Sequence, residues 1–236
     1  DSLREIRAEI EAKQAYQEEL KSEAEAAKAT LLATKEDLNA QREEANALVA
    51  ELESNVAEYS EQLAAVEEEE EEIQKAIVEK TNQLAAQMGW NATSGGYIWP
   101  VTTSRRITSP YGPRNTGIPG ASTNHKGVDI GGVGYSTNVL ATKAGIVITS
   151  AYSSSYGNYV VVSHGKGNTT LYAHMSSRSV SEGDAVDQGD VLGITGSTGV
   201  SSGPHLHYEI TENGSRVNPL NYLPGYIQGN IVDAIT

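Results

Sequence analysis

The first 88 residues contain neither glycine nor proline, whereas all 23 glycines and all 7 prolines of the chain lie at or beyond Gly89. Glycine and proline are the residues that most readily interrupt a helix. Ala, Glu, Leu, Gln and Lys, which dominate this first stretch, are among the best helix formers. The stretch is therefore predicted to be helical throughout, and a physically different domain is predicted to follow it.

Apolar residues recur along the predicted helix at alternating spacings of three and four residues, a pattern typical of a coiled coil. The pattern starts at Leu3, Ile6 and Ile10 and passes a stutter between Leu52 and Val56. Beyond the stutter its positions are Tyr59, Leu63, Val66, Glu70, Ile73, Ile77, Lys80 and Leu84. A single straight helix of this size would reach about 130 Å, too long to bury its stripe against one ordinary domain. We therefore expect a partner strand: a second copy, a hairpin return of the chain or another protein.

Charge is divided as unevenly as glycine. Residues 1–88 carry 23 acidic and 9 basic side chains, a net charge of -14, whereas residues 89–236 carry 8 of each. This acidic balance argues against nucleic acid as a partner. The run Glu67–Glu72 is by default a solvated, self-repelling face, and a basic partner surface is the alternative.

Two classes of structure are excluded by composition. The chain has no cysteine, which excludes disulfides and thiolate metal sites. No apolar run of about 18 residues occurs, so no transmembrane segment is predicted. The chain begins Asp1-Ser2-Leu3 without methionine, and we expect it to be a mature or excised fragment.

Beyond Gly89 the pattern changes to short β-type runs separated by turn residues. Asn91–Gly96 is predicted to be a linker. Gly165–Asn168 is predicted to be a hairpin turn. The candidate strands are residues 139–141, 145–151, 159–163, 169–173, 191–195 and 206–211. No helical pattern interrupts them, so the predicted fold class is a long coiled-coil helix, or helical hairpin, followed by a mostly antiparallel β domain.

The β domain holds all 5 histidines of the chain, and four of them fall in three short blocks. The first block, Asn124–Ile130, contains His125 and Asp129; the second, Leu171–Met175, contains His174; the third, Gly203–Glu209, contains His205 and His207. Residues i and i+2 of a strand point to one face, so His205 and His207 are expected side by side. Catalytic zinc sites use three N or O ligands and leave one position for water. The blocks therefore predict a zinc centre with two additional imidazoles for proton transfer and charge stabilisation.

The three blocks, in this order and spacing, resemble the lysostaphin/LytM-type zinc endopeptidases of bacterial peptidoglycan over roughly residues 98–223. The likeness includes the run Ser109–Arg114 and the glycine–aspartate pairs Gly183-Asp184 and Gly189-Asp190. The resemblance implies that His125, Asp129 and His207 bind zinc. It also implies that His174 and His205 act as general base and electrostatic stabiliser, in an order that stays open.

Two other residues near the blocks are given secondary roles. His164 is predicted to be structural or solvent-facing. Glu209 is expected either to hold an imidazole or to serve in packing.

The predicted domains are a coiled coil at 1–88, a linker at 89–97, a LytM-type domain at 98–225 and a tail at 226–236. A coil followed by such a domain is similar to EnvC-like division proteins, which implies an extracytoplasmic location and a membrane or division complex as a partner. The favoured function is zinc-dependent hydrolysis of peptidoglycan peptides, with the coil regulating or positioning the enzyme. The alternatives are a non-catalytic module that recruits or activates another wall hydrolase, and a wall-penetrating device with the coil as spacer. A short linker also allows the helix to fold back over the cleft, so a latent full chain is a further hypothesis.

Overall fold

The computed structural model describes residues 2–88, 95–114, 123–223, 225, 227 and 228. Most of the predicted linker at 89–97 and of the predicted tail at 226–236 lies outside the described residues. The chain divides into two compact units, Asp1–Glu58 and Tyr59–Thr236. The predicted domain boundaries stay predictions.

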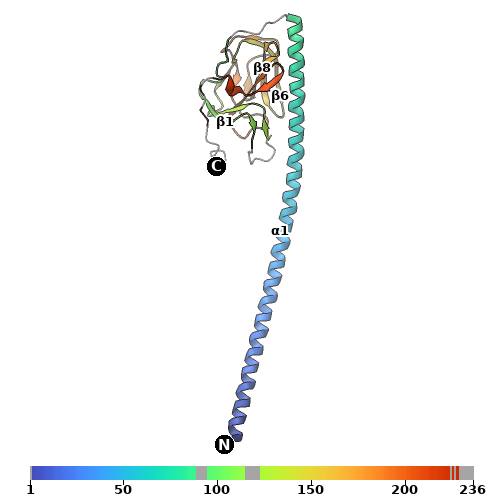
Figure 1. The fold of residues 1–236 in the computed structure, drawn as a ribbon, viewed down its shortest axis with the longest axis vertical. Coiled ribbons are helices and arrows are strands. Elements are labelled where there is room, and N and C mark those ends of the chain that lie inside the picture. Colours follow the sequence, from blue (N-terminus) through green and yellow to red (C-terminus); the bar gives the residue numbers. More distant parts are fainter. Residues whose placement is uncertain (1, 89–94, 115–122, 224, 226, 229–236) are drawn as a thin grey trace. The chain divides into compact units, whose positions relative to one another are not determined.

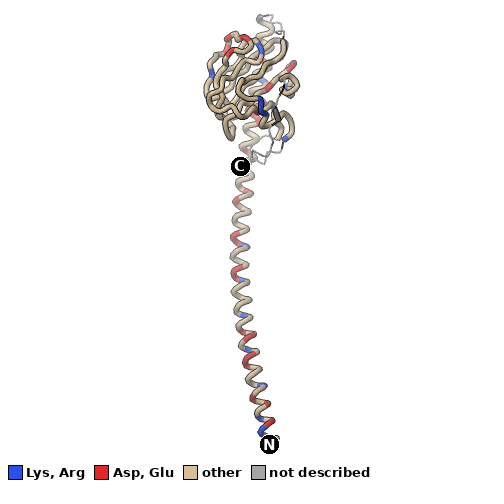
Figure 2. The backbone as a smooth tube through the Cα atoms, turned by 90° about the vertical axis from the view of Figure 1, so that its left-hand side faces the viewer, with Lys and Arg blue, Asp and Glu red and all other residues tan. Residues whose placement is uncertain are grey.

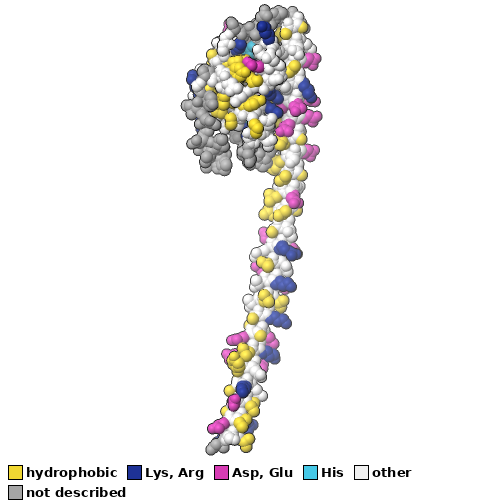
Figure 3. Space-filling view, viewed as in Figure 1, with side chains coloured by type: hydrophobic (Ala, Val, Ile, Leu, Met, Phe, Trp, Pro, Cys, Tyr) yellow, Lys and Arg dark blue, Asp and Glu magenta, His cyan; other side chains and the backbone are white. Residues whose placement is uncertain are grey.

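The predicted helix is confirmed as a single element, α1 (Ser2–Met88), drawn as one unbroken coil in Figure 1. In the first unit every described side chain is exposed, including Leu3, Leu31 and Leu38 at 83%, 70% and 65%. Figure 2 shows acidic and basic residues interspersed along this part of the helix, and Figure 3 shows apolar side chains recurring between them. The apolar stripe of the first unit is therefore exposed, and no other described part of that unit covers it.

The β domain is built on one large sheet with the strand order β10-β6-β7-β8-β12-β4-β1-β14, and β13 pairs with β12. Its long central strands are β6 (Gly145–Ser153), β7 (Gly157–Gly165), β8 (Asn168–Met175) and β12 (His205–Glu212). The shorter strands of this sheet are β1 (Arg106–Ser109), β4 (Val128–Gly131), β10 (Ala185–Val186), β13 (Ser215–Val217) and β14 (Ile227–Gln228). All of these pairings are antiparallel except that of β1 with β14, so the predicted fold class is confirmed.

Smaller elements complete the domain. A three-stranded sheet joins β5 (Asn138–Leu140), β11 (Val191–Ile194) and β9 (Ser177–Arg178). A two-stranded sheet joins β2 (Gly112–Pro113) and β3 (Asn124–His125), and a 3-10 turn, η1, spans Pro219–Asn221. The predicted hairpin turn at Gly165–Asn168 is confirmed, with Gly165, Lys166 and Gly167 at positive φ.

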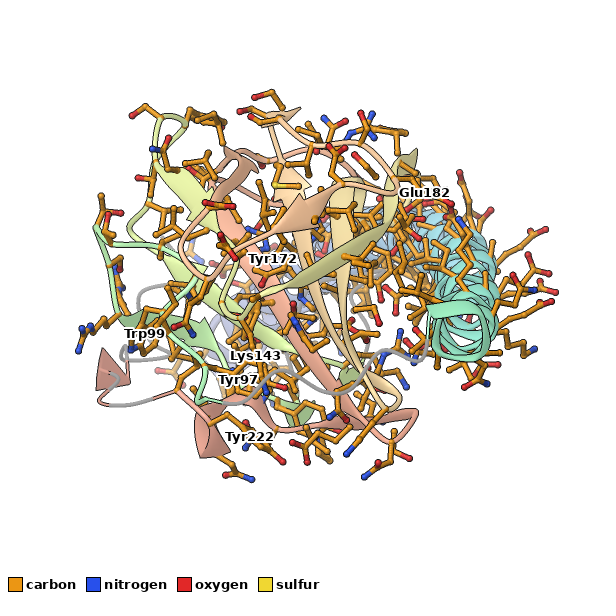
Figure 4. All side chains as sticks on the ribbon, turned by 90° about the horizontal axis from the view of Figure 1, so that it is seen from above. Tyr97, Trp99, Lys143, Tyr172, Glu182 and Tyr222 are labelled. Carbon is orange, nitrogen blue, oxygen red and sulfur yellow. The ribbon has the colours of Figure 1, made fainter. Side chains whose placement is uncertain are left out.

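The two faces of the large sheet carry different cores because side chains alternate along each strand. On β12, Leu206, Tyr208 and Ile210 point into the main core together with Tyr172. Both tyrosines hydrogen-bond the Thr142 hydroxyl at 2.9 Å, which satisfies their buried phenol groups in a chain without phenylalanine. Figure 4 shows Tyr172 within the sheet and Tyr97 with Tyr222 at its lower edge, where their rings meet edge to face at 5.7 Å.

The opposite face of the sheet carries a second apolar cluster, to which α1 contributes. The buried members from the sheet are Ile148, Tyr156, Tyr159, Val161, Leu171 and Ala173. Ile77 of α1 is buried among them, and Ile73 and Leu84 pack alongside. All three helix residues are positions of the predicted coiled-coil stripe. The expectation that the stripe needs a partner strand is therefore wrong for this last part, because the sheet of the same unit covers it.

Candidate metal centre

His125, Asp129 and His207 come from three neighbouring elements, β3, β4 and β12. Asp129 and His207 are directly paired across the antiparallel β4–β12 ladder, and side chains of directly opposed residues point to the same face. The three facing atoms lie close together: His125 Nε2 to His207 Nδ1 is 3.0 Å, His207 Nδ1 to Asp129 Oδ1 is 2.9 Å, and His125 Nε2 to Asp129 Oδ1 is 3.2 Å. Within the described residues, these three form the group of ligand-type side chains able to hold a metal ion.

The far side of each imidazole shows which nitrogen faces the centre with a lone pair. His125 Nδ1 donates to the carbonyl oxygen of Pro110 at 2.9 Å, and His207 Nε2 donates to Glu209 Oε1 at 3.0 Å. A neutral imidazole carries one proton, so His125 Nε2 and His207 Nδ1 are left as acceptors. Two lone pairs and a carboxylate oxygen then face one point, an arrangement that repels itself unless a cation lies between them.

The negative charges around His207 also favour a positive charge at this position. Burial opposes protonation of His207, but its hydrogen bonds with Asp129 and Glu209, and their negative charges, outweigh burial and raise its pKa to about 10. Asp129 is also buried, yet the charge and hydrogen bond of His125, followed by those of His207, hold its pKa well below the usual range. A divalent cation would supply this positive charge without the extra proton.

The donor set fits zinc. Imidazole nitrogens and a carboxylate oxygen are typical zinc ligands, and tetrahedral ligands at about 2.1 Å from zinc lie roughly 3.4 Å apart. The three observed separations of 2.9 to 3.2 Å are close to that value. The chemistry of the group therefore supports a metal site of three protein ligands.

A buried polar network holds His207 from behind. Glu209 accepts from Tyr156 Oη and from Arg216 Nε, both at 2.8 Å, while Arg216 Nη2 donates to Tyr156 Oη at 3.1 Å. Burial alone would raise the pKa of Glu209, but the charge of Arg216 and the hydrogen bond of His207 lower it to about 2. The first of the two roles expected for Glu209, holding an imidazole, is the one its contacts match.

His174 and His205 lie beside this group, with their rings 4.7 Å apart and His174 5.7 Å from the ring of His207. His174 Nδ1 donates to the carbonyl of Thr198 and His205 Nδ1 to the carbonyl of Gly203, both at 2.8 Å. Both imidazoles are thereby fixed in the tautomer that leaves Nε2 with a lone pair. Burial, and then the charges of His207 and His205, lower the pKa of His174 to about 3.

The backbone of His174 is held in an unusual conformation. Its φ is +62°, in the left-handed region that non-glycine residues seldom adopt. The amide of His174 donates to the carbonyl of Tyr156 at 2.8 Å. Such local strain is a feature of functional sites, where surrounding contacts fix a side chain in a chosen direction.

The remaining histidine, His164, is fully buried away from the group. Its Nδ1 donates to the Ala144 carbonyl and its Nε2 contacts the Thr170 hydroxyl, both at 2.9 Å. Burial lowers its pKa to about 4. Of the two roles predicted for His164, the structural one agrees with this environment, and the solvent-facing one is wrong because the side chain is fully buried.

Three residues of the site were not singled out from the sequence. Tyr156 lies in a serine-rich hairpin between the first two blocks, and Arg216 lies in β13, seven residues beyond the third block. No spacing signal points to either residue. Arg114, whose Nη1 lies 3.4 Å from Asp129 Oδ2, ends the run Ser109–Arg114 that carried part of the resemblance. Arg114 could therefore have been named from that run.

The profile of the family described as peptidase family M23 matches residues 123–219. This range contains the four histidines and the aspartate of the three sequence blocks. Residues 123–219 form a domain of peptidase family M23. The chain is 39% identical over 146 residues to an uncharacterized metalloprotease of Haemophilus influenzae, an alignment that covers 61% of this chain and 30% of that protein. It is 41% identical over 127 residues to the DD-carboxypeptidase/endopeptidase Mpg of Neisseria meningitidis, covering 54% and 29%. The chain thus spans about a third of the length of these relatives.

Two further comparisons bear on the M23 domain. A solved structure of a Pseudomonas aeruginosa protein assigned to peptidase M23 matches with a TM-score of 0.52 and 30% identity, covering 67% of this chain and 60% of that one. The murein hydrolase activator NlpD of Salmonella dublin is 31% identical over 147 residues, covering 62% and 36%. The family therefore includes relatives named as peptidases and a relative named as an activator. Within the described residues, no helix is long and apolar enough to cross a membrane.

Proposed function

We propose that the chain is a zinc-dependent endopeptidase that hydrolyses peptide cross-links or bridges of bacterial peptidoglycan outside the cytoplasm. The observation that carries the proposal is the convergence of His125 Nε2, Asp129 Oδ1 and His207 Nδ1 within 3.2 Å of one another. The substrate class is supported by relatives named DD-endopeptidase, among them ShyC of Vibrio cholerae at 39% identity. The helix α1 is proposed to regulate or position the M23 domain, through its stripe, by contact with a second copy or with a membrane or division complex.

In this proposal His125, Asp129 and His207 hold the zinc ion, and Glu209 fixes the ring of His207 in the ligating orientation. Bound zinc would supply a Lewis acid that activates water and polarises the peptide carbonyl. His174 and His205 each have an Nε2 lone pair next to the three ligand residues. One of them takes the proton of the attacking water and the other, in protonated form, stabilises the negative charge that develops on the carbonyl oxygen.

The test is release of new amino groups from purified peptidoglycan by the full chain, with added zinc and with a chelator. Parallel variants are His207→Ala, which removes a ligand, and Leu38→Ala, a control in the exposed helix. We expect chelator-sensitive release that His207→Ala lowers by about 10³-fold or more and that the control retains. Zinc content measured by mass spectrometry should fall in His207→Ala alone.

The second candidate function is activation of another wall hydrolase, which the likeness to NlpD favours. Under this alternative the full chain releases no amino groups by itself, but it increases the release by an added peptidoglycan amidase. That increase would persist in His207→Ala as long as the variant folds. This result would replace the endopeptidase proposal by the activator.

A further inference from the structure

The last part of α1, Glu69–Leu84, lies along the sheet of its own unit. The helix residues that contact the sheet recur every three or four positions: Glu69, Glu70, Ile73, Ile77, Lys80, Thr81 and Leu84. They therefore form one face of the helix. Ile77 and Thr81 are each only 2% exposed, whereas Glu71 and Glu72, on the other faces, are exposed. We call Glu69–Leu84 the docked segment.

The docked segment covers the same face of the sheet that carries the metal group. In the β8–β12 ladder Ala173 is directly opposite His207 and Leu171 is directly opposite Glu209. Directly opposed residues share a face, and both Ala173 and Leu171 belong to the apolar cluster that Ile77 completes. The covered surface thus begins one strand, about 4.8 Å, from a candidate metal ligand.

Carboxylates hold the end of the docked segment nearest the site. Glu69 accepts from the backbone N–H of Ser154 at 3.1 Å and of Ser155 at 3.3 Å, and also from the Ser154 hydroxyl. Glu70 accepts from the Ser155 hydroxyl at 2.7 Å. Glu69 and Glu70 of the run Glu67–Glu72 therefore bind donor groups of the β6–β7 turn while remaining partly exposed.

The turn that receives these carboxylates also belongs to the site. The next residue, Tyr156, donates to Glu209 at 2.8 Å and its carbonyl accepts from the amide of His174 at 2.8 Å. The carbonyl of Ser155 accepts from Val200 at 2.9 Å. The docked segment and the histidines consequently share one hairpin turn.

At the other end of the docked segment, Lys80 Nζ donates to the carbonyl of Ile148 at 3.1 Å and to Glu182 at 2.7 Å. Glu182, labelled in Figure 4, lies beside the helix. This ion pair is partly exposed, with 39% and 57% of the two side chains accessible. The docked segment therefore combines polar contacts near both ends with a small apolar contact made by Ile73, Ile77 and Leu84.

The packing of the docked segment is imperfect in a way that favours release. Among the described residues, Gln74 Nε2 is the buried side-chain polar atom that lacks a hydrogen-bond partner. A buried donor without a partner destabilises the docked state, because the same group would be hydrated when the helix leaves. Undocking restores the hydration of Gln74, and this gain offsets part of the free energy lost when the apolar contact is exposed to water.

We propose that the docked segment is an internal competitor of the peptide substrate, fastened by Glu69 and Glu70, and that hydrolysis requires its release from the sheet. This inference rests on the proposed endopeptidase function. An extended peptide advances about 3.3 Å per residue, and neighbouring strands lie about 4.8 Å apart. A peptide bound across the metal group with three residues on the β8 side would therefore pass over Ala173 and onto β7, where the helix lies.

The experiment uses the absence of cysteine in the chain. A single cysteine introduced by Thr81→Cys reports docking through its rate of thiol alkylation, and Gln83→Cys reports an exposed position of the same helix. Each is combined with Glu69→Ala and Glu70→Ala, or with the matched pair Glu71→Ala and Glu72→Ala, which removes the same charge from exposed positions. Amino-group release from peptidoglycan is measured on the same zinc-loaded full chains.

We expect slow alkylation at position 81 and fast alkylation at 83 in the parent chain. Removing Glu69 and Glu70 should raise the rate at 81 by about tenfold or more, since hydrogen bonds to charged groups are the stronger ones. Amino-group release from peptidoglycan should rise by a similar factor. The matched pair Glu71→Ala and Glu72→Ala should change neither the alkylation rate nor the release. Ile77→Asp, which places a charge in the apolar centre of the contact, should reproduce both increases.

Two results would overturn the inference while leaving the endopeptidase intact. One is equal alkylation at 81 and 83 in the parent chain, because the segment would then not be docked. The other is faster alkylation in the variants with unchanged release, because docking would then not restrict the site. Absence of chelator-sensitive release from every chain, undocked variants included, would instead refute the proposed function and remove the basis for this regulation.

Discussion

Both parts of α1 lack glycine and proline and repeat apolar residues at spacings of three and four, yet they bury these residues differently. In the first unit Leu31, Leu38 and Leu48 remain at least half exposed. In the second unit Ile77, at an equivalent position of the stripe, is 2% exposed. The difference comes from what lies opposite: a sheet face lined by Val161, Leu171 and Ala173 in one case, and no other described element of its unit in the other. The periodicity identifies the apolar stripe of the helix, but it does not show which surface, if any, packs against each part of the stripe.

The largest expected effect compares a leucine-to-alanine change in the sheet under the docked segment with the same change in the exposed part of α1. Leu171→Ala removes a side chain that is 3% exposed in the cluster under the docked segment, and buried Leu→Ala changes typically cost about 3 kcal/mol of the free energy of unfolding. Leu38→Ala, at a position 65% exposed, should change it by less than about 0.5 kcal/mol. Denaturant unfolding of the full chain measures both. A loss above about 1 kcal/mol in Leu38→Ala would mean that a second copy covers the first unit in solution.

The second largest expected effect is a pH dependence of stability caused by the buried imidazole of His164. The helix contains no histidine and should not contribute to this dependence. The folded pKa of His164 is about 4 against 6.5 for the free side chain, so the unfolded chain binds more protons between these values. Stability should therefore fall as the pH is lowered through this window, and the part due to His164 between pH 7.5 and 5 is about 2 kcal/mol.

His164→Gln keeps a donor and an acceptor for Ala144 and Thr170 but does not titrate. The drop in unfolding free energy between pH 7.5 and 5 should be smaller in this variant by that amount. The same drop in both chains would show that His164 is protonated or solvated in the native protein.

The smallest expected effect compares one ion pair in each region. Lys80 and Glu182 are 2.7 Å apart, and Lys13 and Glu9 are 2.9 Å apart. Partly exposed pairs are worth about 0.2–1 kcal/mol, and Lys80 has the additional bond to the Ile148 carbonyl. Lys80→Met should raise thiol alkylation at position 81 by about two- to fivefold, whereas Lys13→Met should leave it unchanged. An equal effect of both variants would mean that alkylation follows fraying of the whole helix rather than undocking.

The sequence was sufficient for the helix, the antiparallel β domain and the grouping of His125, Asp129 and His207. The helix follows from local propensity and from the absence of glycine and proline, which need no tertiary information. The grouping follows from short blocks whose spacing resembles a known family and from the two-residue period that places His205 and His207 on one face. The roles of these residues in metal binding and proton transfer stay predictions.

Sequence reasoning did not find Tyr156 and Arg216, which complete the hydrogen bonds of Glu209 behind His207. Their contact is set by the register of β8 and β13 against β12 and by the path of the β6–β7 turn, and none of these leaves a pattern in the local sequence. The same holds for Glu69 and Glu70, because a run of glutamates looks the same whether it faces water or the amides of a turn.

The sequence by itself determined where the helix ends, which residues alternate between the faces of each strand and which side chains can bind a metal ion. Those properties depend on neighbours within a few residues. Only the tertiary structure decided that the last stripe of the helix packs against a sheet and that this sheet face is the one carrying the metal group. The physical reason is that burial depends on which surfaces meet, and strand order and register bring together residues that are distant in the chain.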